Sequence, residues 1–171
     1  GLWGVPDIDR TQTMIIMGGN PMASNGSVWT VPDFRTRAKA LQARGGELIV
    51  IDPRRSETAK IADRHIFIRP GGDAFMLVAL LKTVLSLRSA TDPDWLLGTA
   101  ALSDALASFD AEHCAARAGV TMDDITHLAS RLTAGPAALY GRMGTSTQSF
   151  GTLCAWLIAC INAASGQLDC E

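Results

Sequence analysis

The sequence predicts a layered α/β domain whose central sheet is mostly parallel. Four short apolar runs rich in Ile, Val and Leu are each followed by a loop with glycine or proline, and helix-like segments lie between the runs. Such runs are typical of buried strands, and their alternation with helices implies parallel pairing through right-handed crossovers. The chain has 171 residues, 47% of them hydrophobic and 19% charged, which is enough to bury the core of one ordinary domain.

Each predicted strand ends at residues that break extended structure. The predicted strands cover residues 13–17, 47–51, 65–68 and 137–140, and the loops after them are GGNP, DPRR, RPGGD and GRMGT. Glycine and proline end strand pairing and favour turns. Because the carboxyl ends of parallel strands meet at one edge of a sheet, we expect these loops to gather where ligands bind in this class of fold.

The helices are predicted from apolar periodicity and from capping residues. They cover residues 34–43, 73–88, 121–132 and 150–165. Asp73 is expected to cap the second helix, and Thr121 with Asp124 has capping-box spacing at the start of the third. Several helices in succession at about residues 90–132 indicate a helical insertion before the chain returns to the sheet.

These elements predict a single three-layer, Rossmann-like domain over residues 1–171. The chain begins at Gly1 without Met, and we expect it to be a segment of a longer protein. Two of its helical stretches, residues 73–86 and 153–164, are apolar on nearly every side, where a surface helix shows a polar face. Two explanations stay open: these helices lie in the middle of the domain, or missing polypeptide covers them.

Charge and cysteine spacing exclude several classes of protein. The net charge of −2 gives no sequence-wide basic patch, so we expect no nucleic-acid partner. The longest apolar stretch is too short for a membrane span and no signal peptide opens the chain, so a cytoplasmic location is the default and periplasmic export stays open. The cysteines have no zinc-site spacing and are expected to be buried small side chains: Cys114, Cys154, Cys160 and Cys170.

The four loops together offer groups that suit a ligand with phosphates and a base. Backbone amides of the GGN segment can meet an anion, and Asp52 can accept hydrogen bonds from ribose hydroxyls or an exocyclic amine. Arg54 can pair with phosphate. The G-x-G-x-x-G and G-x-x-x-x-G-K-[ST] motifs are absent. A nicotinamide or flavin dehydrogenase domain is therefore the least favoured hypothesis for this chain.

The order and content of these loops resemble one family, the molybdopterin oxidoreductases related to dimethyl sulfoxide reductase, formate dehydrogenase and periplasmic nitrate reductase. The matching segments are MGGNPMASNG, GGELIVIDPRRSETAKIADRHIFIRPGGDA and YGRMGTSTQSFGTLCAWLIACINAASGQLD, which cover most of the chain. The resemblance implies the central α/β domain that binds molybdopterin guanine dinucleotide. Complete enzymes of the family carry two of these dinucleotides around one molybdenum or tungsten atom.

By this resemblance, each loop contacts a different part of the cofactor. The residues implied along the pyrophosphate are Gly19, Asn20, Pro21 and Ser24. Those implied at the ribose and the guanine are Asp52, Pro53, Arg54, Gly71 and Asp73. Those implied near the pterin are Gly141, Arg142, Met143, Gly144 and Thr145. One departure is Gly72, where many relatives have Thr.

Other parts of the family's site lie outside this sequence. Family members hold the metal with a residue from an upstream segment, which can follow an iron–sulfur cluster, and complete the site with a C-terminal domain. None of the four cysteines falls at the metal-ligand position, so the resemblance implies no metal ligand and no catalytic residue in this chain. The chain alone is expected to be inactive, with the remaining domains of its parent chain and an electron-transfer subunit as partners.

Two functions from different classes stay open. The first is the cofactor-binding segment of a molybdenum or tungsten oxidoreductase, which positions the dinucleotide for two-electron chemistry. The second is a non-catalytic nucleotide-binding or assembly module that keeps the fold, because a fold does not fix a function.

Overall fold

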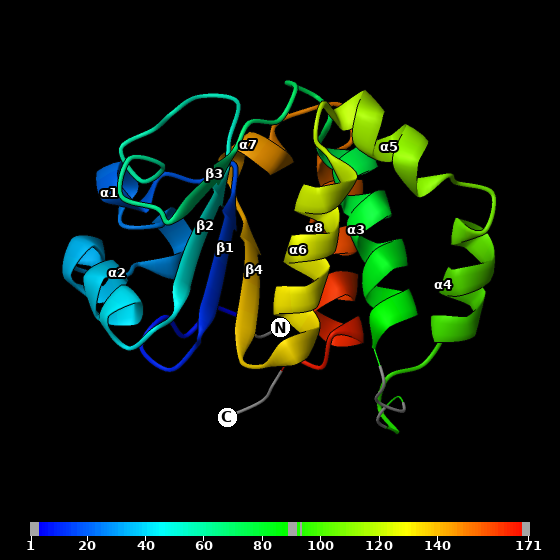
Figure 1. Cartoon of the computed structure of the whole chain (residues 1–171), viewed down its shortest axis with the longest axis horizontal. Helices are drawn as coiled ribbons and strands as arrows, with labels where there is room; N and C mark the ends of the chain where they lie inside the picture. Colours follow the sequence, from blue (N-terminus) through cyan, green and yellow to red (C-terminus); the bar gives the residue numbers. More distant parts are fainter. Residues whose placement is uncertain (1–3, 89–91, 93, 169–171) are drawn as a thin grey trace.

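A parallel sheet forms the centre of the molecule (Figure 1). The computed structural model describes residues 4–88, 92 and 94–168. Within them the sheet has four strands in the order β3-β2-β1-β4, and every pairing is parallel. The strands are β1 (Thr13–Met17), β2 (Glu47–Ile51), β3 (Arg64–Ile66) and β4 (Ala137–Gly141). The predicted fold class is confirmed.

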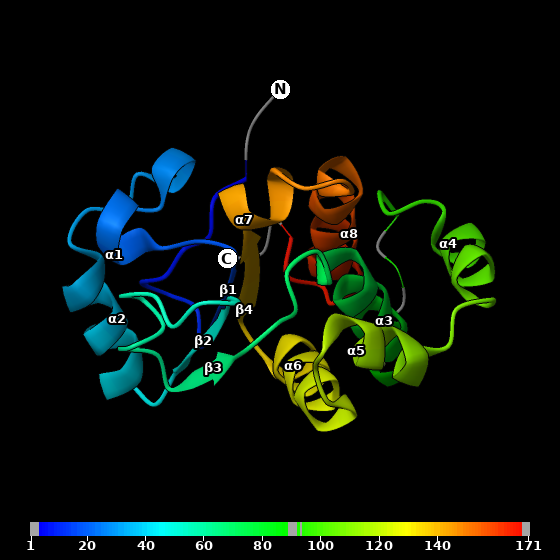
Figure 2. The ribbon, with the colours of Figure 1, turned by 90° about the horizontal axis from the view of Figure 1, so that it is seen from above.

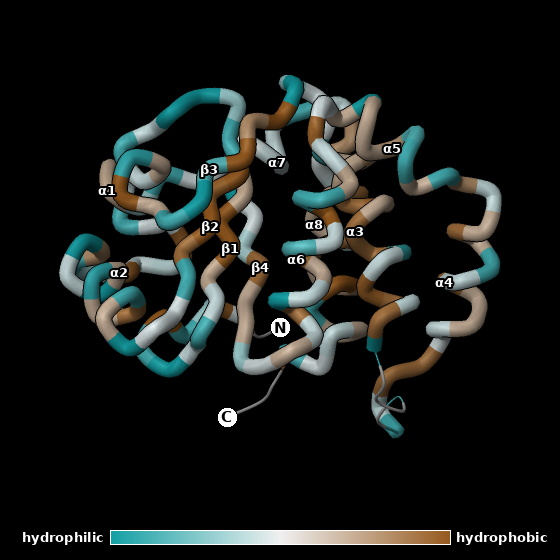
Figure 3. Tube along the Cα trace, viewed as in Figure 1, coloured by the Kyte–Doolittle hydropathy of each residue, from teal (hydrophilic) through white to brown (hydrophobic). Residues whose placement is uncertain are grey.

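Both faces of the sheet are buried, which explains why the strands are apolar without alternation. Met14 and Ile16 of β1 pack with Phe34 on one face, whereas Ile15 and Met17 belong to the core on the other face. Figure 3 shows the hydrophobic residues concentrated along β1, β2 and α3.

Helices cover the sheet on both sides and make three layers (Figures 1 and 2). One side carries α1 (Pro21–Ser24), the 3-10 helix η1 (Ser27–Trp29) and α2 (Phe34–Ala43). The other side carries α3 (Asp73–Leu87), α6 (Met122–Ala134) and α8 (Gly151–Ala164), with α4 (Thr99–Leu106) and α5 (Ala111–Ala118) outside them. The short helix α7 (Met143–Ser146) follows β4.

The segment predicted as a helical insertion forms α4, α5 and α6 in succession. Residues 90, 91 and 93, at the start of that segment, lie outside the described residues. Helix α6 packs against α3 and contacts β4, so it contributes to the helical layer on the sheet. An ion pair also joins α6 to the sheet: Arg131 Nε of α6 lies 3.0 Å from Glu47 Oε2 at the start of β2.

The predicted capping box at the start of α6 is present. The Asp124 amide donates to Thr121 Oγ1 at 3.1 Å, and the Thr121 amide donates to Asp124 Oδ2 at 3.4 Å. Two amide groups that the first helical turn leaves without partners are thereby satisfied. The sequence signal at this position therefore determines where the helix begins.

Two details of the prediction are wrong. The third strand is shorter than expected and ends at Ile66, because the chain then leaves the sheet and the Arg69 amide donates to Ala118 O at 2.8 Å. Asp73 is the first residue of α3 and not its N-cap, which is Gly72. A Cβ atom at Gly72 would lie 2.8 Å from Ala118 Cα, so only glycine fits the cap position against the end of α5.

The two apolar helices have different surroundings. Helix α3 contacts α5, α6 and α8, so the chain itself covers it and the first of the two explanations holds for α3. Helix α8 buries Leu157 and Ile161 against the core but leaves Leu153 and Trp156 exposed. Phe150, directly before α8, is exposed as well. An apolar surface therefore remains on the outer side of α8.

Side chains from α8 and from the segment after it form hydrogen bonds with the backbone at the outer edge of β4. Asn162 Oδ1 accepts from the Leu139 amide at 3.0 Å, and Asn162 Nδ2 donates to Leu139 O at 2.8 Å. Gln167 Oε1 accepts from the Ala137 amide at 2.9 Å. Unpaired edge strands favour addition of further strands, and here side-chain amides occupy the groups that such a strand would use.

The remaining sequence expectations concern cysteines and membrane segments. Cys114 and Cys154 are buried, Cys160 is half-buried, and Cys170 lies outside the described residues. Among the helices that the structure describes, none is long and apolar enough to cross a membrane.

Candidate cofactor-binding edge

The loops after the four strands lie at the carboxyl edge of the sheet. β1 is central, with β2 on one side and β4 on the other, and the chain crosses from β3 over to β4. The order of the strands therefore reverses beside β1, and open parallel sheets bind ligands at such a point. The loops after β1 and β4 flank this position.

Two glycines join the loop after β1 to the loop after β4. The Gly144 amide donates to Gly18 O at 2.8 Å. A Cβ atom on Gly18 would lie 2.7 Å from Thr145 N, and one on Gly144 would lie 2.7 Å from Gly18 Cα. The two backbones thus touch directly, which no side chain would allow, so a ligand at this point lies over the paired loops.

Asn20 joins the loop after β1 to the loop after β2. Its Oδ1 accepts from Thr58 Oγ1 at 2.7 Å and from the Thr58 amide at 3.2 Å, and its Nδ2 donates to Glu57 Oε2 at 2.7 Å. The Thr58 hydroxyl also accepts from the Met22 amide at 3.2 Å, and Thr58 is fully buried. The Asn20 side chain is therefore occupied within the protein, and its contribution is to position the loops.

Asp52 turns the chain at the end of β2. Its Oδ1 accepts from the Arg54 amide at 2.7 Å, a local hydrogen bond typical of turn-forming aspartates. Its backbone O lies 3.0 Å from Nε2 of His65 on the neighbouring strand. The Asp52 carboxylate is half-buried and keeps acceptor capacity for a ligand.

Asp73 is a buried carboxylate in the segment that follows the outermost strand β3, with 7% of its surface exposed. Burial is the main cause that raises the pKa of Asp73, the negative charge of Asp52 raises it further, and hydrogen bonds from its own amide and from Gln148 lower it. A carboxylate is buried at a cost unless something pairs with it. Asp73 thus interacts with Gln148 of the loop after β4 and is influenced by the charge of Asp52 after β2.

The environment of Asp73 extends into α8. Gln148 Nε2 lies 3.7 Å from Cys154 Sγ. Burial, and then the charge of Asp73, raise the pKa of Cys154 to about 11. A thiol with a raised pKa is protonated and unreactive at neutral pH, so Cys154 acts as a packing residue here.

Arg142 brings an unsatisfied side-chain donor to the same edge. Its amide donates to Met17 O at 3.0 Å, which fixes the start of the loop beside β1. Its side-chain Nε is buried and has no hydrogen-bond partner among the described residues. A buried donor without a partner is costly, so a ligand acceptor at this position would remove the cost.

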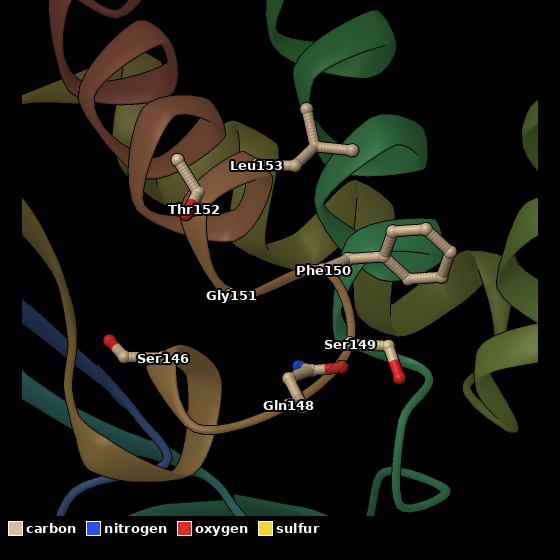
Figure 4. Close-up of a pocket in the computed structure, with 7 residues that line it drawn as sticks. All are labelled: Ser146, Gln148, Ser149, Phe150, Gly151, Thr152 and Leu153. Atoms are coloured by element: carbon tan, nitrogen blue, oxygen red, sulfur yellow. The ribbon is translucent and has the colours of Figure 1, made fainter.

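A cavity of about 320 Å³ opens between α7 and the start of α8 (Figure 4). It is lined by Ser146, Gln148, Ser149, Phe150, Gly151, Thr152 and Leu153. Small-molecule sites have volumes of this order or larger. Because Gln148 also hydrogen-bonds to Asp73, the cavity adjoins this carboxylate at the start of α3.

The other residues implied by the resemblance differ in how deeply they are buried. The buried ones are Gly19, Pro21 and Thr145. The exposed ones are Ser24, Pro53, Arg54, Gly71, Met143 and Gly144, and the half-buried one is Gly141. Ser24 Oγ donates to Asn20 O at 3.1 Å, and Thr145 Oγ1 donates to Arg142 O at 2.7 Å. Both hydroxyls thus support the loop backbone.

Two residues of this edge are not among the site residues predicted from the sequence. Gln148 is a lone amide shortly before a helix, a weak signal. Thr58 lacks any local signal, because only the fold shows that its hydroxyl meets Asn20.

Metal-ligating side chains do not gather in the described part of the chain. No three His, Cys, Asp or Glu residues there lie close enough to hold a metal ion.

Comparison with known proteins identifies relatives along nearly the whole chain. The chain is 30% identical over 163 residues to an assimilatory nitrate reductase of Haloferax mediterranei, covering 95% of this chain and 22% of the relative. It is 25% identical over 174 residues to a dimethyl sulfoxide/trimethylamine N-oxide reductase of Cereibacter sphaeroides, covering 94% and 21%. A shorter match, 40% identical over 72 residues, is to a periplasmic nitrate reductase of Desulfovibrio desulfuricans, covering 41% and 9%. No protein-family model matches the chain.

A solved structure shares the fold. Acetylene hydratase from Pelobacter acetylenicus superposes with a TM-score of 0.81 at 20% identity, covering 96% of this chain and 23% of that one. Nearly all of this chain aligns with these relatives, but it spans only about a fifth of their length. The named relatives are enzymes of the kind that the loop segments resemble. Over nearly its whole length, the chain is therefore similar to a segment of molybdopterin oxidoreductases.

Proposed function

We propose that this chain is the domain that binds molybdopterin guanine dinucleotide in a bis-dinucleotide molybdenum or tungsten oxidoreductase. The observation that carries the proposal is the buried Asp73 at the carboxyl edge of the parallel sheet, which Gln148 of the loop after β4 reaches and on which the charge of Asp52 acts. Carboxylates accept hydrogen bonds from the N–H groups of guanine and from ribose hydroxyls, so this cluster suits the guanosine end of a dinucleotide.

The residues at the strand reversal suit the rest of such a ligand. The buried Nε of Arg142 needs an acceptor, and phosphate or pterin oxygen would supply one. Gly18 and Gly144 let the backbones of the loops after β1 and β4 touch beside it, so the two loops that would flank the ligand are held together. The donor set therefore fits a ligand with phosphates at β1 and a base near β2 and β3.

Each group in this chain has a role in binding. Asp52 and Asp73 would hold the guanosine end, Arg142 would neutralise negative charge, and the link between Asn20 and Thr58 would keep two loops in place. When bound, the cofactor's metal supplies the two-electron redox chemistry. The described residues supply position and electrostatics, and we expect the isolated chain to be inactive.

The test uses the full-length gene product that contains these residues, purified from a host able to make the cofactor. Molybdenum and tungsten are measured by mass spectrometry, and guanine nucleotide is measured after release with acid. The expected result is one metal with about two guanine nucleotides per protein. Protein repeatedly free of metal and nucleotide would favour the non-catalytic module instead.

Variants connect this result to the proposed site. Asp52→Asn and Asp73→Asn remove charge at nearly constant volume, and each is expected to weaken nucleotide retention about tenfold, as loss of a charge-assisted hydrogen bond does. Asp104→Asn on exposed α4 is the matched control and should retain the parent's nucleotide content. Normal retention in both site variants would show that the carboxylates do not bind the guanosine.

The proposal includes the partners that the family implies. An iron–sulfur cluster in a preceding segment and an electron-transfer subunit would complete the redox chain, and the location would be cytoplasmic unless an export signal precedes these residues. Iron analysis of the same full-length sample tests for the cluster.

A further inference from the structure

An exposed aromatic side chain stands beside the candidate site. Phe67 follows β3 directly and is 58% exposed, more than any other Phe, Trp or Tyr residue in the described part of the chain. A single exposed apolar side chain is common on protein surfaces. The surroundings of Phe67 therefore decide whether its ring has a function.

Backbone pairing places Phe67 next to the turn after β2. The strands β2 and β3 are parallel neighbours. The Asp52 amide donates to Ile66 O at 3.2 Å, so the residue that follows Ile66 lies beside Asp52. Ile66 and Ile68 belong to the core on the α3 side of the sheet, so Phe67 between them points to the opposite face. The exposed ring thus lies at the carboxyl edge, near a carboxylate of the proposed site.

The imidazole of His65 packs against the Phe67 ring. The centroids of the two rings are 4.1 Å apart, and their planes make an angle of 50°. His65 Nε2 lies 3.0 Å from Asp52 O, and Nε2 carries the proton of this hydrogen bond because a carbonyl oxygen can only accept. The hydrogen bond fixes the imidazole, and the imidazole limits the positions open to the Phe67 ring. The aromatic pair is therefore anchored on Asp52, whose carboxylate is proposed to bind the guanosine.

The second ring nitrogen of His65 is not explained by packing. Nδ1 is buried and has no hydrogen-bond partner among the described residues. A buried polar atom without a partner lowers stability, which an apolar side chain at this position would avoid. The unpaired nitrogen makes His65 a poor choice for packing alone and is consistent with a role at the adjoining candidate site.

We propose that Phe67, positioned by His65, stacks on the face of the purine base while the carboxylates bind the edge of the base. This inference rests on the proposed function and adds a residue that the loop motifs do not indicate. Guanine offers N–H donors at its edge and a flat face that stacks favourably on aromatic rings. Asp52 lies beside Phe67, and its charge acts on the buried Asp73, so both kinds of contact are available in one region.

The first test uses the full-length gene product from a host that makes the cofactor. Phe67→Leu removes the ring but keeps an apolar side chain, and Phe67→Tyr keeps the ring. Phe109→Leu is the matched control, since Phe109 is 45% exposed between α4 and α5. Guanine nucleotide that stays bound is measured at intervals at an elevated temperature below the unfolding transition.

We expect Phe67→Leu to lose one of the two nucleotides about tenfold faster than the parent, because stacking on an aromatic ring is lost. Phe67→Tyr and the control should match the parent. Equal retention in Phe67→Leu and the parent would overturn the proposal.

A fluorescent variant measures the stacking itself. Phe67→Trp is purified without cofactor from a host unable to make it, and guanosine monophosphate is added as the probe. A base stacked on an indole ring quenches its emission, so the emission of Phe67→Trp should fall by more than that of the parent or of Phe109→Trp. Equal changes in the three proteins would contradict the stacking.

The two measurements separate this inference from the proposed function. Loaded parent protein whose Phe67→Leu variant keeps its nucleotide equally long overturns the stacking alone. Parent protein that never contains metal or guanine, together with quenching of Phe67→Trp by the probe, supports the aromatic contact with a purine and overturns the proposed cofactor.

Discussion

The hydroxyl of Thr58 donates to Asn20 Oδ1 across 2.7 Å and joins the loops that follow β1 and β2. Because Thr58 is fully buried and also accepts from the Met22 amide, its hydroxyl is satisfied as both donor and acceptor. Buried polar groups with complete hydrogen bonding fix one arrangement of the chain. The distance between the loops after β1 and β2 is thus set by the hydrogen bonds of Thr58 to Asn20 and Met22.

Replacement of this hydroxyl is expected to destabilise the chain. Thr58→Val has the same shape but leaves the Met22 amide without an acceptor, at a cost of about 1–3 kcal/mol in the free energy of unfolding. Thr58→Ser keeps the hydroxyl and should lose much less. Chemical denaturation of both variants makes the comparison, and equal stability of the two would contradict a role for the hydroxyl.

Contact between Gly18 and Gly144 leads to a second prediction. Gly144→Ala places a Cβ atom 2.7 Å from Gly18 Cα, so the loops must separate. We expect a loss of about 1–3 kcal/mol, the usual cost of overpacking, measured by thermal or chemical unfolding. Gly4→Ala is the control, because a Cβ atom there has no neighbour within 4 Å among the described residues. The prediction fails if both alanine variants are as stable as the parent.

The side chain of Asn162 is expected to protect the edge of β4. Asn162→Leu removes both hydrogen bonds to Leu139 and should cost about 1–3 kcal/mol, with faster hydrogen exchange at the Leu139 amide. Thr152→Ala on the exposed side of the same helix is the control and should change neither quantity. Unchanged exchange at Leu139 in the leucine variant would show that the edge is protected by other means.

Local patterns were sufficient to predict most of the fold. The strands at residues 13–17 and 47–51 and the helix at residues 34–43 are found at the predicted bounds, because apolar runs and breakers act within a few residues. The third strand and the cap of α3 were placed wrongly because the end of α5 decides both, through Ala118. That contact joins residues about fifty positions apart, which no local pattern reports.

The candidate site was predictable only as a set of loops. Glycine, proline and aspartate after strands indicated the correct edge of the sheet. The pairing of Asn20 with Thr58 and of Asp73 with Gln148 depends on how the loops pack, so no local sequence pattern indicates either pair. Exposure of α8 could likewise be recognised only after α3 was seen to be covered by other helices.

Ionisation of Asp73 is expected to make stability depend on pH. Burial raises the pKa of Asp73 in the folded chain above its ordinary value of 3.8, so between these two pKa values the folded state binds more protons than the unfolded state. The free energy of unfolding therefore falls as pH rises through this window and stays lowered at neutral pH. Asp73→Asn removes the ionisation and retains an oxygen that can accept from Gln148.

The asparagine variant should therefore be at least as stable as the parent at pH 7 and should lose this advantage below the pKa of the unfolded chain. Chemical denaturation of both proteins from pH 3 to pH 8 measures the difference, with Asp104→Asn as the exposed control. If Asp73 also holds guanosine, the full-length variant will retain less nucleotide despite its stability. A variant that is less stable than the parent at pH 7 would show instead that the charged form of Asp73 stabilises the fold, because its hydrogen bonds would then outweigh the cost of burial.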